Sequence, residues 1–282
     1  MGGSYRAELL KVMKRPAMWV LAAVFLVLAQ VFGYLLPYVA YRSGGGTGFA
    51  AGQTAAQLLS DLLPRSLVPN TLGGFPMFAG AIAVIMGGLL AGSEYGWGTL
   101  KTMLTQRPRR LSVLGGKLAV SLLMALALVV AVFAVNGLWS WVIASVEHRA
   151  APWPGLLELG RGIGAGFLII WMWSLFGALL GILFRSTPLA VGLGMVWALV
   201  VENLVRGFAG LVGFLDALQK WLPGVNAGSL VASLGAVPQD RPGGTPGVTA
   251  AVGGPQALVA LIAYVVVLAL TAALVLHRQD VG

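Results

Sequence analysis

Residues 93–117 read SEYGWGTLKTMLTQRPRRLSVLGGK, and this stretch interrupts a sequence that is otherwise mostly apolar. It contains five of the 18 lysines and arginines of the chain: Lys101, Arg107, Arg109, Arg110 and Lys117. Apolar runs flank it at residues 75–91 and 118–135. A basic stretch between two such runs predicts a connection between two membrane-spanning helices. We therefore expect residues 93–117 to be the segment through which the chain receives signals from outside the bilayer.

The composition is that of an integral membrane protein. Hydrophobic residues make up 58% of the 282 residues and charged residues only 10%, whereas soluble domains average about 25% charged residues. The absence of cysteine excludes disulfides, thiolate nucleophiles and cysteine-ligated zinc. The net charge of +9 does not indicate a nucleic-acid partner, because in membrane proteins the placement of basic residues matters more than their sum.

The hydropathy pattern predicts an all-α protein with six membrane spans in one domain, residues 1–282. A helix needs about 20 apolar residues to cross the hydrocarbon layer. The expected spans are residues 17–41, 71–92, 118–143, 162–184, 188–201 and 256–276. The fifth run reaches only about 21 Å as a helix. Either Glu202, Asn203 and Arg206 therefore lie within the bilayer, or this helix ends early in a cavity.

The segments that precede or connect the spans contain patterns that predict further helices. Residues 1–16 contain an amphipathic helix over residues 4–15 that Pro16 ends, and it is expected either to lie in the membrane interface or to be a basic flank. Residues 42–70 read as an external loop with one short surface helix. Residues 203–255 form an external connection with a re-entrant or interfacial helix at 208–222, followed by a mostly irregular stretch. Between the fourth and fifth spans, Thr187 is expected to be the N-cap and Pro188 the first helical residue.

Small residues at four-residue spacing predict close helix packing. The second span carries Ala79, Ala83, Gly87 and Ala91, so we expect it to be enclosed by protein rather than by lipid. The fourth carries Gly162, Gly166, Gly177 and Gly181. The fifth carries Ala190, Gly194 and Ala198, which are candidates for contacts within the chain or across a dimer.

The distribution of basic residues predicts the orientation. Six spans place both termini on one side, and the segments on that side hold eleven basic residues: Arg6, Lys11, Lys14, Arg15, Lys101, Arg107, Arg109, Arg110, Lys117, Arg185 and Arg278. The other seven are spread over segments about twice as long. Cytoplasmic segments of membrane proteins are enriched in Lys and Arg. We therefore expect both termini and residues 93–117 to be cytoplasmic.

No pattern typical of an enzyme is present. The glycines of GGK at residues 115–117 lack the spacing and the hydroxyl residue of a phosphate-binding loop. Metal-binding and nucleophile motifs are also missing from the sequence, and Glu94, Glu147 and Glu158 are separated by whole spans. We expect no catalytic residue, no metal site and no directly bound cofactor.

A few polar residues interrupt the spans. Gln30 and Asn136 are expected to form interhelical hydrogen bonds or to line a translocation path. Glu202 and Arg206 are four residues apart, so they can pair on one helix face. They are either a polar element of a translocation path or a self-paired helix end at the membrane surface.

The connection between the second and third spans resembles the first cytoplasmic loop of type 2 ATP-binding-cassette permeases. The pattern in that family is a glutamate, GT-L-[RK], a leucine pair, a proline, an arginine and a G-K that opens the third span. The matching residues are Glu94, Gly98, Thr99, Leu100, Lys101, Leu104, Pro108, Arg110 and Lys117. Arg109 departs from the pattern. The six spans, the amphipathic N-terminus and WLPGVNA at residues 221–227 are also similar to that family.

This resemblance implies a partner for the chain. It identifies residues 98–104 as a coupling helix that docks on a separate ATPase subunit, with Glu94 and Lys117 fixing the ends of the adjoining spans. It further implies two permease and two ATPase copies in a bacterial cytoplasmic membrane, with ATP and magnesium held by the ATPase. The expected function is export of an amphipathic drug, lipid or hydrophobic peptide.

Two other functions are compatible with the sequence. One is an ion-coupled secondary transporter or channel that uses Glu202 and Arg206. The other is a membrane anchor that holds an ATPase without transporting anything. Under all three functions, the basic residues of 93–117 can also be explained by the enrichment of Lys and Arg in cytoplasmic segments alone.

Overall fold

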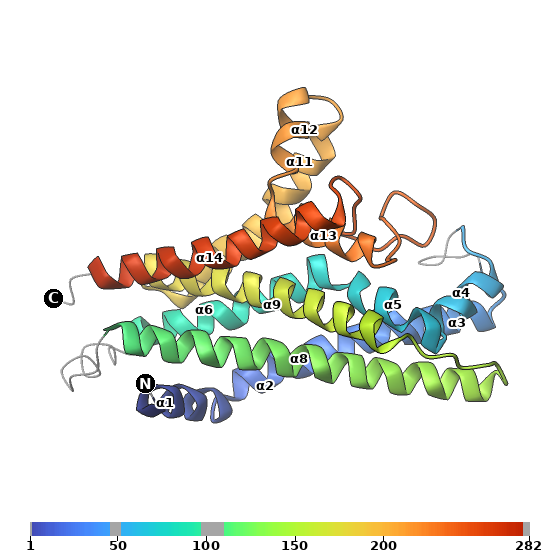
Figure 1. Ribbon diagram of the computed structural model, residues 1–282, viewed down its shortest axis with the longest axis horizontal. Helices are drawn as coiled ribbons and strands as arrows, with labels where there is room; N and C mark the ends of the chain where they lie inside the picture. The colour runs from blue at the N-terminus through green and yellow to red at the C-terminus, as the bar shows by residue number, and fades with distance from the viewer. Residues whose placement is uncertain (1, 46–51, 97–109, 279–282) are drawn as a thin grey trace.

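The computed structural model describes residues 2–45, 52–96 and 110–278, and within these it leaves out the side chains of residues 2–4, 94–96, 110 and 111. The described part is a bundle of helices that run along one long axis (Figure 1). Among these described residues, six helices are long and apolar enough to cross a membrane, which confirms the predicted number. Spans 1 to 6 are Pro16–Arg42, Pro64–Ser93, Ser112–Val146, Leu156–Phe184, Thr187–Ala209 and Gly254–Arg278.

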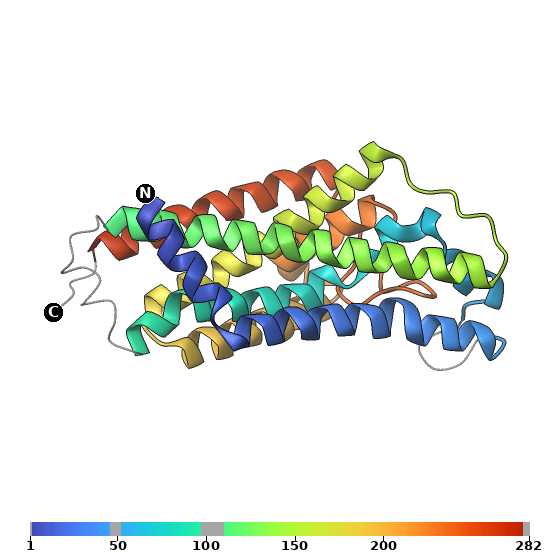
Figure 2. The same ribbon diagram turned by 90° about the horizontal axis from the view of Figure 1, so that it is seen from below.

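The two ends of the bundle differ in what they carry. What we term the near end holds α1 (Gly2–Met13), the last turns of α6 (Gly80–Gly96) and α14 (Gly254–Arg278), and the first turns of α8 (Arg110–Val146) (Figures 1 and 2). The far end holds α4 (Ala55–Leu62) and the connection from α8 to α9 (Leu156–Phe184). The first and the last described residues, Gly2 and Arg278, therefore lie at one end, as an even number of spans requires.

Span 1 matches its prediction closely. It consists of α2 (Pro16–Gln30), a π-helical turn at Val31–Leu35 and α3 (Leu36–Arg42). Pro16 occupies the first turn, where its missing N–H costs no helical hydrogen bond. α4 follows as the expected short surface helix, and Thr54 with Gln57 forms a capping box at its start.

Span 2 begins at Pro64, before the predicted residue 71. A 3₁₀ turn at Pro64–Ser66 leads into α5 (Leu67–Gly73), a π-helical turn at Phe75–Ala79 and then α6. The first residues of α5 are buried by the other helices. Hydropathy underestimates such a segment because protein encloses it, and span 2 is the most buried of the six.

Spans 3 and 4 also extend beyond the predictions. α8 begins at Arg110 rather than at residue 118, so residues 110–117 of the 93–117 stretch are helical. α9 begins at Leu156 rather than at residue 162. The ends of both helices contain polar residues. Hydropathy therefore predicts that these spans begin later than they do in the structure.

The fifth span does not end at residue 201. α10 (Thr187–Met195), a π-helical turn (Val196–Val201) and α11 (Glu202–Ala209) form one continuous helical path. Its N-cap is Ser186 instead of the predicted Thr187, and Pro188 lies in the first turn. Glu202, Asn203 and Arg206 therefore belong to a spanning helix.

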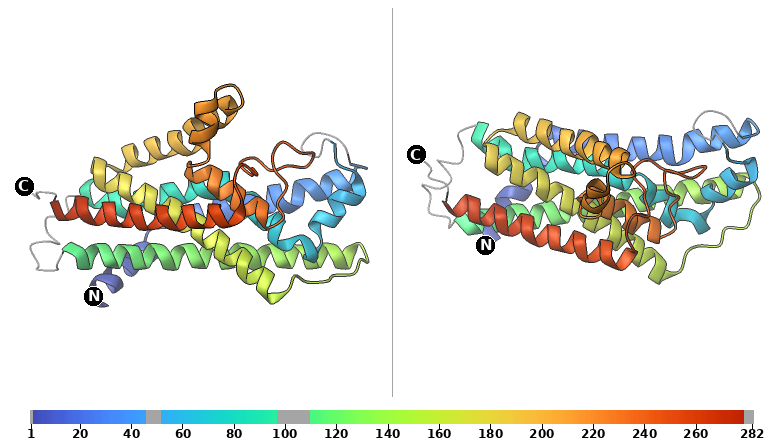
Figure 3. Two further views of the ribbon diagram at one scale, coloured as in Figure 1. Left: turned by 45° about the horizontal axis from the view of Figure 1, so that its top comes forward. Right: turned by 90° about the horizontal axis from the view of Figure 1, so that it is seen from above.

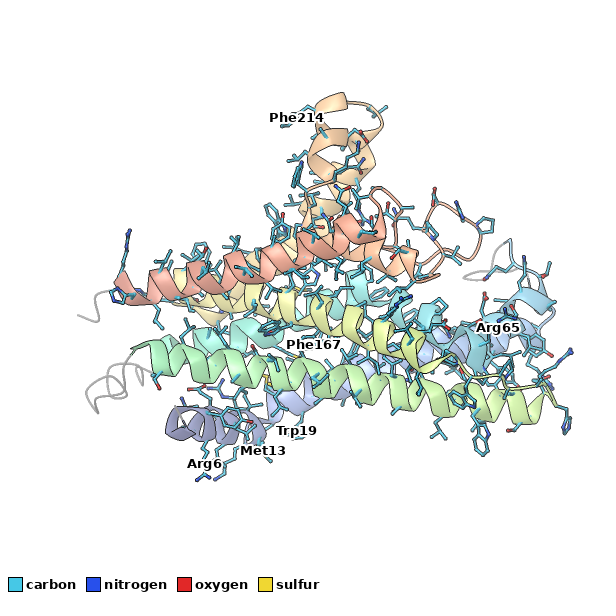
Figure 4. All side chains as sticks on the ribbon, in the orientation of Figure 1. Arg6, Met13, Trp19, Arg65, Phe167 and Phe214 are labelled. Carbon is cyan, nitrogen blue, oxygen red and sulfur yellow. The ribbon has the colours of Figure 1, made fainter. Side chains whose placement is uncertain are left out.

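The connection from span 5 to span 6 contains two different helices. α12 (Gly213–Gln219) follows α11, and the two project sideways from the bundle, with Phe214 toward their outer tip (Figures 1, 3 and 4). α13 (Pro223–Ser233) is buried along most of its length, so the prediction of irregular structure was wrong for these residues. Tertiary packing against α14 and the Phe75–Ala79 turn stabilises this glycine-containing helix.

Close packing of α6 against α9 forms the centre of the bundle. A Cβ atom on Gly87 would lie 1.9 Å from the Ser174 carbonyl oxygen, and one on Gly177 would lie 2.1 Å from the Val84 carbonyl oxygen. This confirms that span 2 is enclosed by protein. Gly194 of span 5 also faces Val84, and Ala190 is fully buried. These two residues therefore make their contacts within the chain.

Candidate functional site

A buried ion pair joins α1 to α8 at the near end. Glu8 of α1 and Lys117 of α8 are 1% and 7% exposed, and Glu8 Oε2 lies 3.2 Å from Lys117 Nζ. Lys117 also donates to the Leu90 carbonyl oxygen of α6, at 3.1 Å. Lys117 thus connects three helices through one ammonium group, as a buried charge requires several polar partners.

Two further basic residues lie at the same place, Lys11 within α1 and Arg15 at the start of α2. Lys11 donates to the other carboxylate oxygen of Glu8, at 2.8 Å. Arg15 donates to the Leu89 carbonyl oxygen of α6, at 3.0 Å. The apolar side of α1 packs on the bundle, since Val12 is buried and Leu9 contacts the core. We call Glu8, Lys11, Arg15 and Lys117, together with the Leu89 and Leu90 carbonyls, the near-end polar cluster.

Most of the predicted coupling residues fall outside the described part of the chain. Gly98, Thr99, Leu100, Lys101, Leu104 and Pro108 belong to residues 97–109. Glu94 lies in α6 and Arg110 begins α8, but their side chains are not described. Among the predicted coupling residues, Lys117 is the one with a described side chain, and it lies in the near-end polar cluster. The cluster therefore flanks both ends of the 97–109 connection.

Glu8 is the residue that sequence reasoning missed. Its signal was present in the pattern, because Glu8 lies among Tyr5, Leu9 and Val12 on the apolar side of the N-terminal helix. An acid on an apolar helix face requires a buried basic partner. The sequence did not indicate that this partner is Lys117, which lies 109 residues away.

A second polar group lies between span 1 and span 3. Gln30 donates to Asn136 at 2.6 Å, and Asn136 donates to Thr71 of span 2 at 2.9 Å. One turn further along, Tyr34 and Ser140 share a hydrogen bond of 2.9 Å. The structure thus brings together Gln30 and Asn136, both predicted as translocation-path candidates.

At the far end, span 1 contacts the charged residue Glu147, which directly follows span 3. The hydroxyls of Tyr38 and Tyr41 donate to the two oxygens of Glu147, at 2.7 and 2.8 Å. Arg42 lies 3.3 Å from the same carboxylate. These hydrogen bonds, that of Tyr38 foremost, hold the pKa of Glu147 below its ordinary value. Span 1 is therefore attached to span 3 along much of its length.

Glu202 and Arg206 do not form an ion pair with each other. Glu202 is buried and accepts hydrogen bonds from the Trp197 indole, at 3.2 Å, and from the Gly224 backbone N–H. Gly224 lies in the first turn of α13, so the carboxylate satisfies a free amide at the positive end of that helix. Arg206 donates to Asn203, while its Nε and Nη1 atoms are buried with no partner among the described residues.

The four path candidates form two separate groups. Gln30 and Asn136 belong to α2 and α8, whereas Glu202 and Arg206 belong to α11 on the opposite side of the bundle (Figure 1). This arrangement does not place the four residues along one continuous path within the chain. Among the residues in 2–45, 52–96 and 110–278, no group of three or more His, Cys, Asp or Glu side chains could hold a metal ion.

Comparison with known protein families gives a match that covers most of the chain. Residues 19–281 match the model of a family described as protein of unknown function (DUF2705). The match begins within span 1 and extends through span 6, so it covers all of the membrane-spanning bundle except the first residues of span 1. No curated protein matches the chain.

Proposed function

The chain belongs to the DUF2705 family of proteins of unknown function, and we propose that it is the membrane-spanning subunit of an ATP-driven exporter of the ATP-binding-cassette type. Two copies would act with two separate ATPase subunits in a bacterial cytoplasmic membrane. The ATPase would hold the ATP and magnesium. The cargo would be amphipathic: a drug, a lipid or a hydrophobic peptide.

The observation that carries this proposal is the near-end polar cluster. It joins α1, α6 and α8 on both sides of residues 97–109, which include residues 98–104, the segment that the resemblance identifies as a coupling helix. A force on that segment would therefore reach span 2, span 3 and α1 together. Because span 2 packs closely on span 4, the movement would be passed into the centre of the bundle.

The sequence and the exposed surfaces support a membrane-spanning subunit that depends on a separate ATPase subunit. The chain has no phosphate-binding loop of its own, so energy from ATP must come from a partner. Spans 1, 5 and 6 are the least buried of the six, and their apolar faces would contact lipid and a second copy. Residues 203–255 would lie outside the cytoplasm, with both termini inside.

The test is reconstitution with an ATPase encoded beside the gene for this chain. Leu100→Asp combined with Leu104→Asp should abolish both ATPase binding and ATP-dependent export. Thr102→Asp on the same segment is the matched control and should keep most of both activities. If the double variant binds and exports as the unchanged protein does, the coupling assignment is wrong.

A second candidate function rests on Glu202. A buried carboxylate in a membrane span is costly and tends to be functional, and an ion-coupled transporter could use it with Arg206. In that case Glu202→Gln would abolish transport driven by an ion gradient in vesicles that lack ATP. ATPase binding without flux under any condition would instead identify a membrane anchor.

A further inference from the structure

A cavity of about 100 Å³ lies between spans 1, 2 and 3. The connection from α13 to α14 supplies Thr245 to its wall, so four parts of the chain meet there. Span 1 contributes Ala29 and Phe32, and span 2 contributes Asn70 and Phe78. The cavity lies within one copy of the chain and next to the Gln30–Asn136–Thr71 hydrogen bonds.

Two π-helical turns contribute residues to the wall of this cavity. They are Val31–Leu35 in span 1 and Phe75–Ala79 in span 2. Phe32 and Phe78, one from each turn, stack with ring centroids 5.9 Å apart and planes within 9°. A π-helical turn departs from regular helical hydrogen bonding, and such turns are frequent at functional sites. Two of them at one cavity indicate a site rather than a packing defect.

The polar part of the wall is made of neutral groups. Asn70, Thr71, Asn136 and Thr245 line the cavity, and none of its lining residues is charged. Asn136 is 2% exposed and has hydrogen bonds on both its oxygen and its nitrogen. The amide oxygen of its neighbour Gln30 is buried with no partner among the described residues. Gln30 does not line the cavity itself and is linked to it through its hydrogen bond to Asn136.

From these features we infer that the cavity binds the uncharged, hydrogen-bonding head of an amphipathic molecule. Amides and hydroxyls at membrane depth can satisfy a hydroxyl- or amide-bearing head, whereas an ion would find no counter-charge on the wall. The phenylalanine rings supply the apolar remainder of the site. That this molecule is the exported cargo rests on the proposed function.

The size of the cavity limits what enters it. Sites for whole drug-sized ligands usually measure about 300–1,000 Å³, so about 100 Å³ accepts only a part of such a molecule. The head group would be held there while the apolar body remains between the helices or in the lipid. Selection would therefore act on the head and tolerate variation in the body.

The experiment uses the purified full chain in lipid nanodiscs and a set of photoreactive probes. Each probe has the same diazirine-bearing decyl chain, and the heads are glycerol ester, trimethylammonium and sulfate. We expect the glycerol probe to label peptides that contain the cavity residues of spans 1 and 2, and the charged probes to label them far less. Equal labelling by all three heads would overturn the inference.

A cavity-filling variant tests the position of the site. Ala29→Phe places a ring in the cavity, and Ala23→Phe places the same ring on the exposed side of span 1. We expect Ala29→Phe to weaken binding of the glycerol probe by about tenfold, or ~1.4 kcal/mol, and Ala23→Phe to leave it unchanged. Unchanged labelling in Ala29→Phe would contradict the assignment.

A second pair of variants tests the contribution of a hydroxyl group on the cavity wall that lies outside the spans. Thr245→Val keeps the shape of the side chain and deletes the hydroxyl on the cavity wall, whereas Thr249→Val changes a partly buried residue that does not line it. We expect partial loss of glycerol-probe binding in the first and none in the second. This pair keeps the test valid if Ala29→Phe fails to fold.

The outcomes for binding and for export are separable. Probe binding needs no ATPase, so specific labelling without ATP-driven flux would reject the exporter and keep the site. ATP-driven flux of the glycerol probe that is unaffected by Ala29→Phe would keep the exporter and reject the cavity as its cargo site.

Discussion

The Glu8 carboxylate lies 3.2 Å from the Lys117 ammonium, in a position where both side chains are almost completely buried. This contact joins the N-terminal helix to the start of span 3, and Lys117 extends it to the Leu90 carbonyl of span 2. A buried pair of this kind adds little net stability over apolar residues, but removing one partner is expensive. The pair therefore fixes where α1 lies.

Glu8→Gln is expected to destabilise the protein strongly. It leaves the Lys117 charge buried without its carboxylate, which should cost about 3–5 kcal/mol. Thermal unfolding in detergent measures the loss. The double variant Glu8→Leu with Lys117→Met should recover most of it, because both charges are then gone. Lys11→Met, which removes a partly exposed partner of Glu8, should cost at most about 1 kcal/mol.

Two glycines on the same helix should respond oppositely to alanine. At Gly177 the new Cβ would meet the backbone of Val84, whereas at Gly164 it would meet nothing within 4 Å. Gly177→Ala should force α6 and α9 apart and lower the unfolding temperature. Gly164→Ala should be neutral or stabilise by about 0.5–1 kcal/mol, because alanine is the better helix former. Equal effects at both positions would argue against the α6–α9 packing.

Acid should release span 1 from span 3 through Glu147. The pKa of Glu147 is below its ordinary value when folded, so its contribution to stability is present above the unfolded-state pKa. That contribution is lost as the pH falls through the folded pKa. We expect the fall in unfolding temperature below about pH 4.5 to be smaller in Glu147→Gln than in the unchanged protein. Glu158→Gln, an exposed acid on α9, should keep the original pH dependence.

Glu202→Gln should loosen the start of α13. A glutamine has one acceptor oxygen where the carboxylate has two, so either Trp197 or Gly224 loses its hydrogen bond. An unsatisfied buried donor costs about 1–3 kcal/mol. Hydrogen–deuterium exchange over residues 223–226 should become faster. Asp216→Asn on the exposed α12 should leave this exchange unchanged, and protection that persists in Glu202→Gln would exclude the capping role.

The predicted sites were only partly accessible to sequence reasoning. Gln30 and Asn136 were recognisable because polar residues are rare in spans, but their contact across 106 residues was not. Glu202 and Arg206 looked like a pair because of their spacing. In the fold, however, the start of α13 supplies a better partner for the carboxylate. Glu8 was missed because an acid in a basic, amphipathic segment resembles an ordinary surface residue until its neighbour is known.

The sequence by itself determined the six spans and the placement of both termini at one end, because long apolar runs and their number are local properties of the chain. The tertiary structure alone decided where spans 2, 3 and 4 begin, and that α13 is a buried helix. It also decided which polar groups meet, in the Glu8–Lys117 pair and around the cavity between spans 1, 2 and 3. These features depend on contacts between residues far apart in sequence, and burial by protein stabilises polar and glycine-containing segments that hydropathy places outside the membrane.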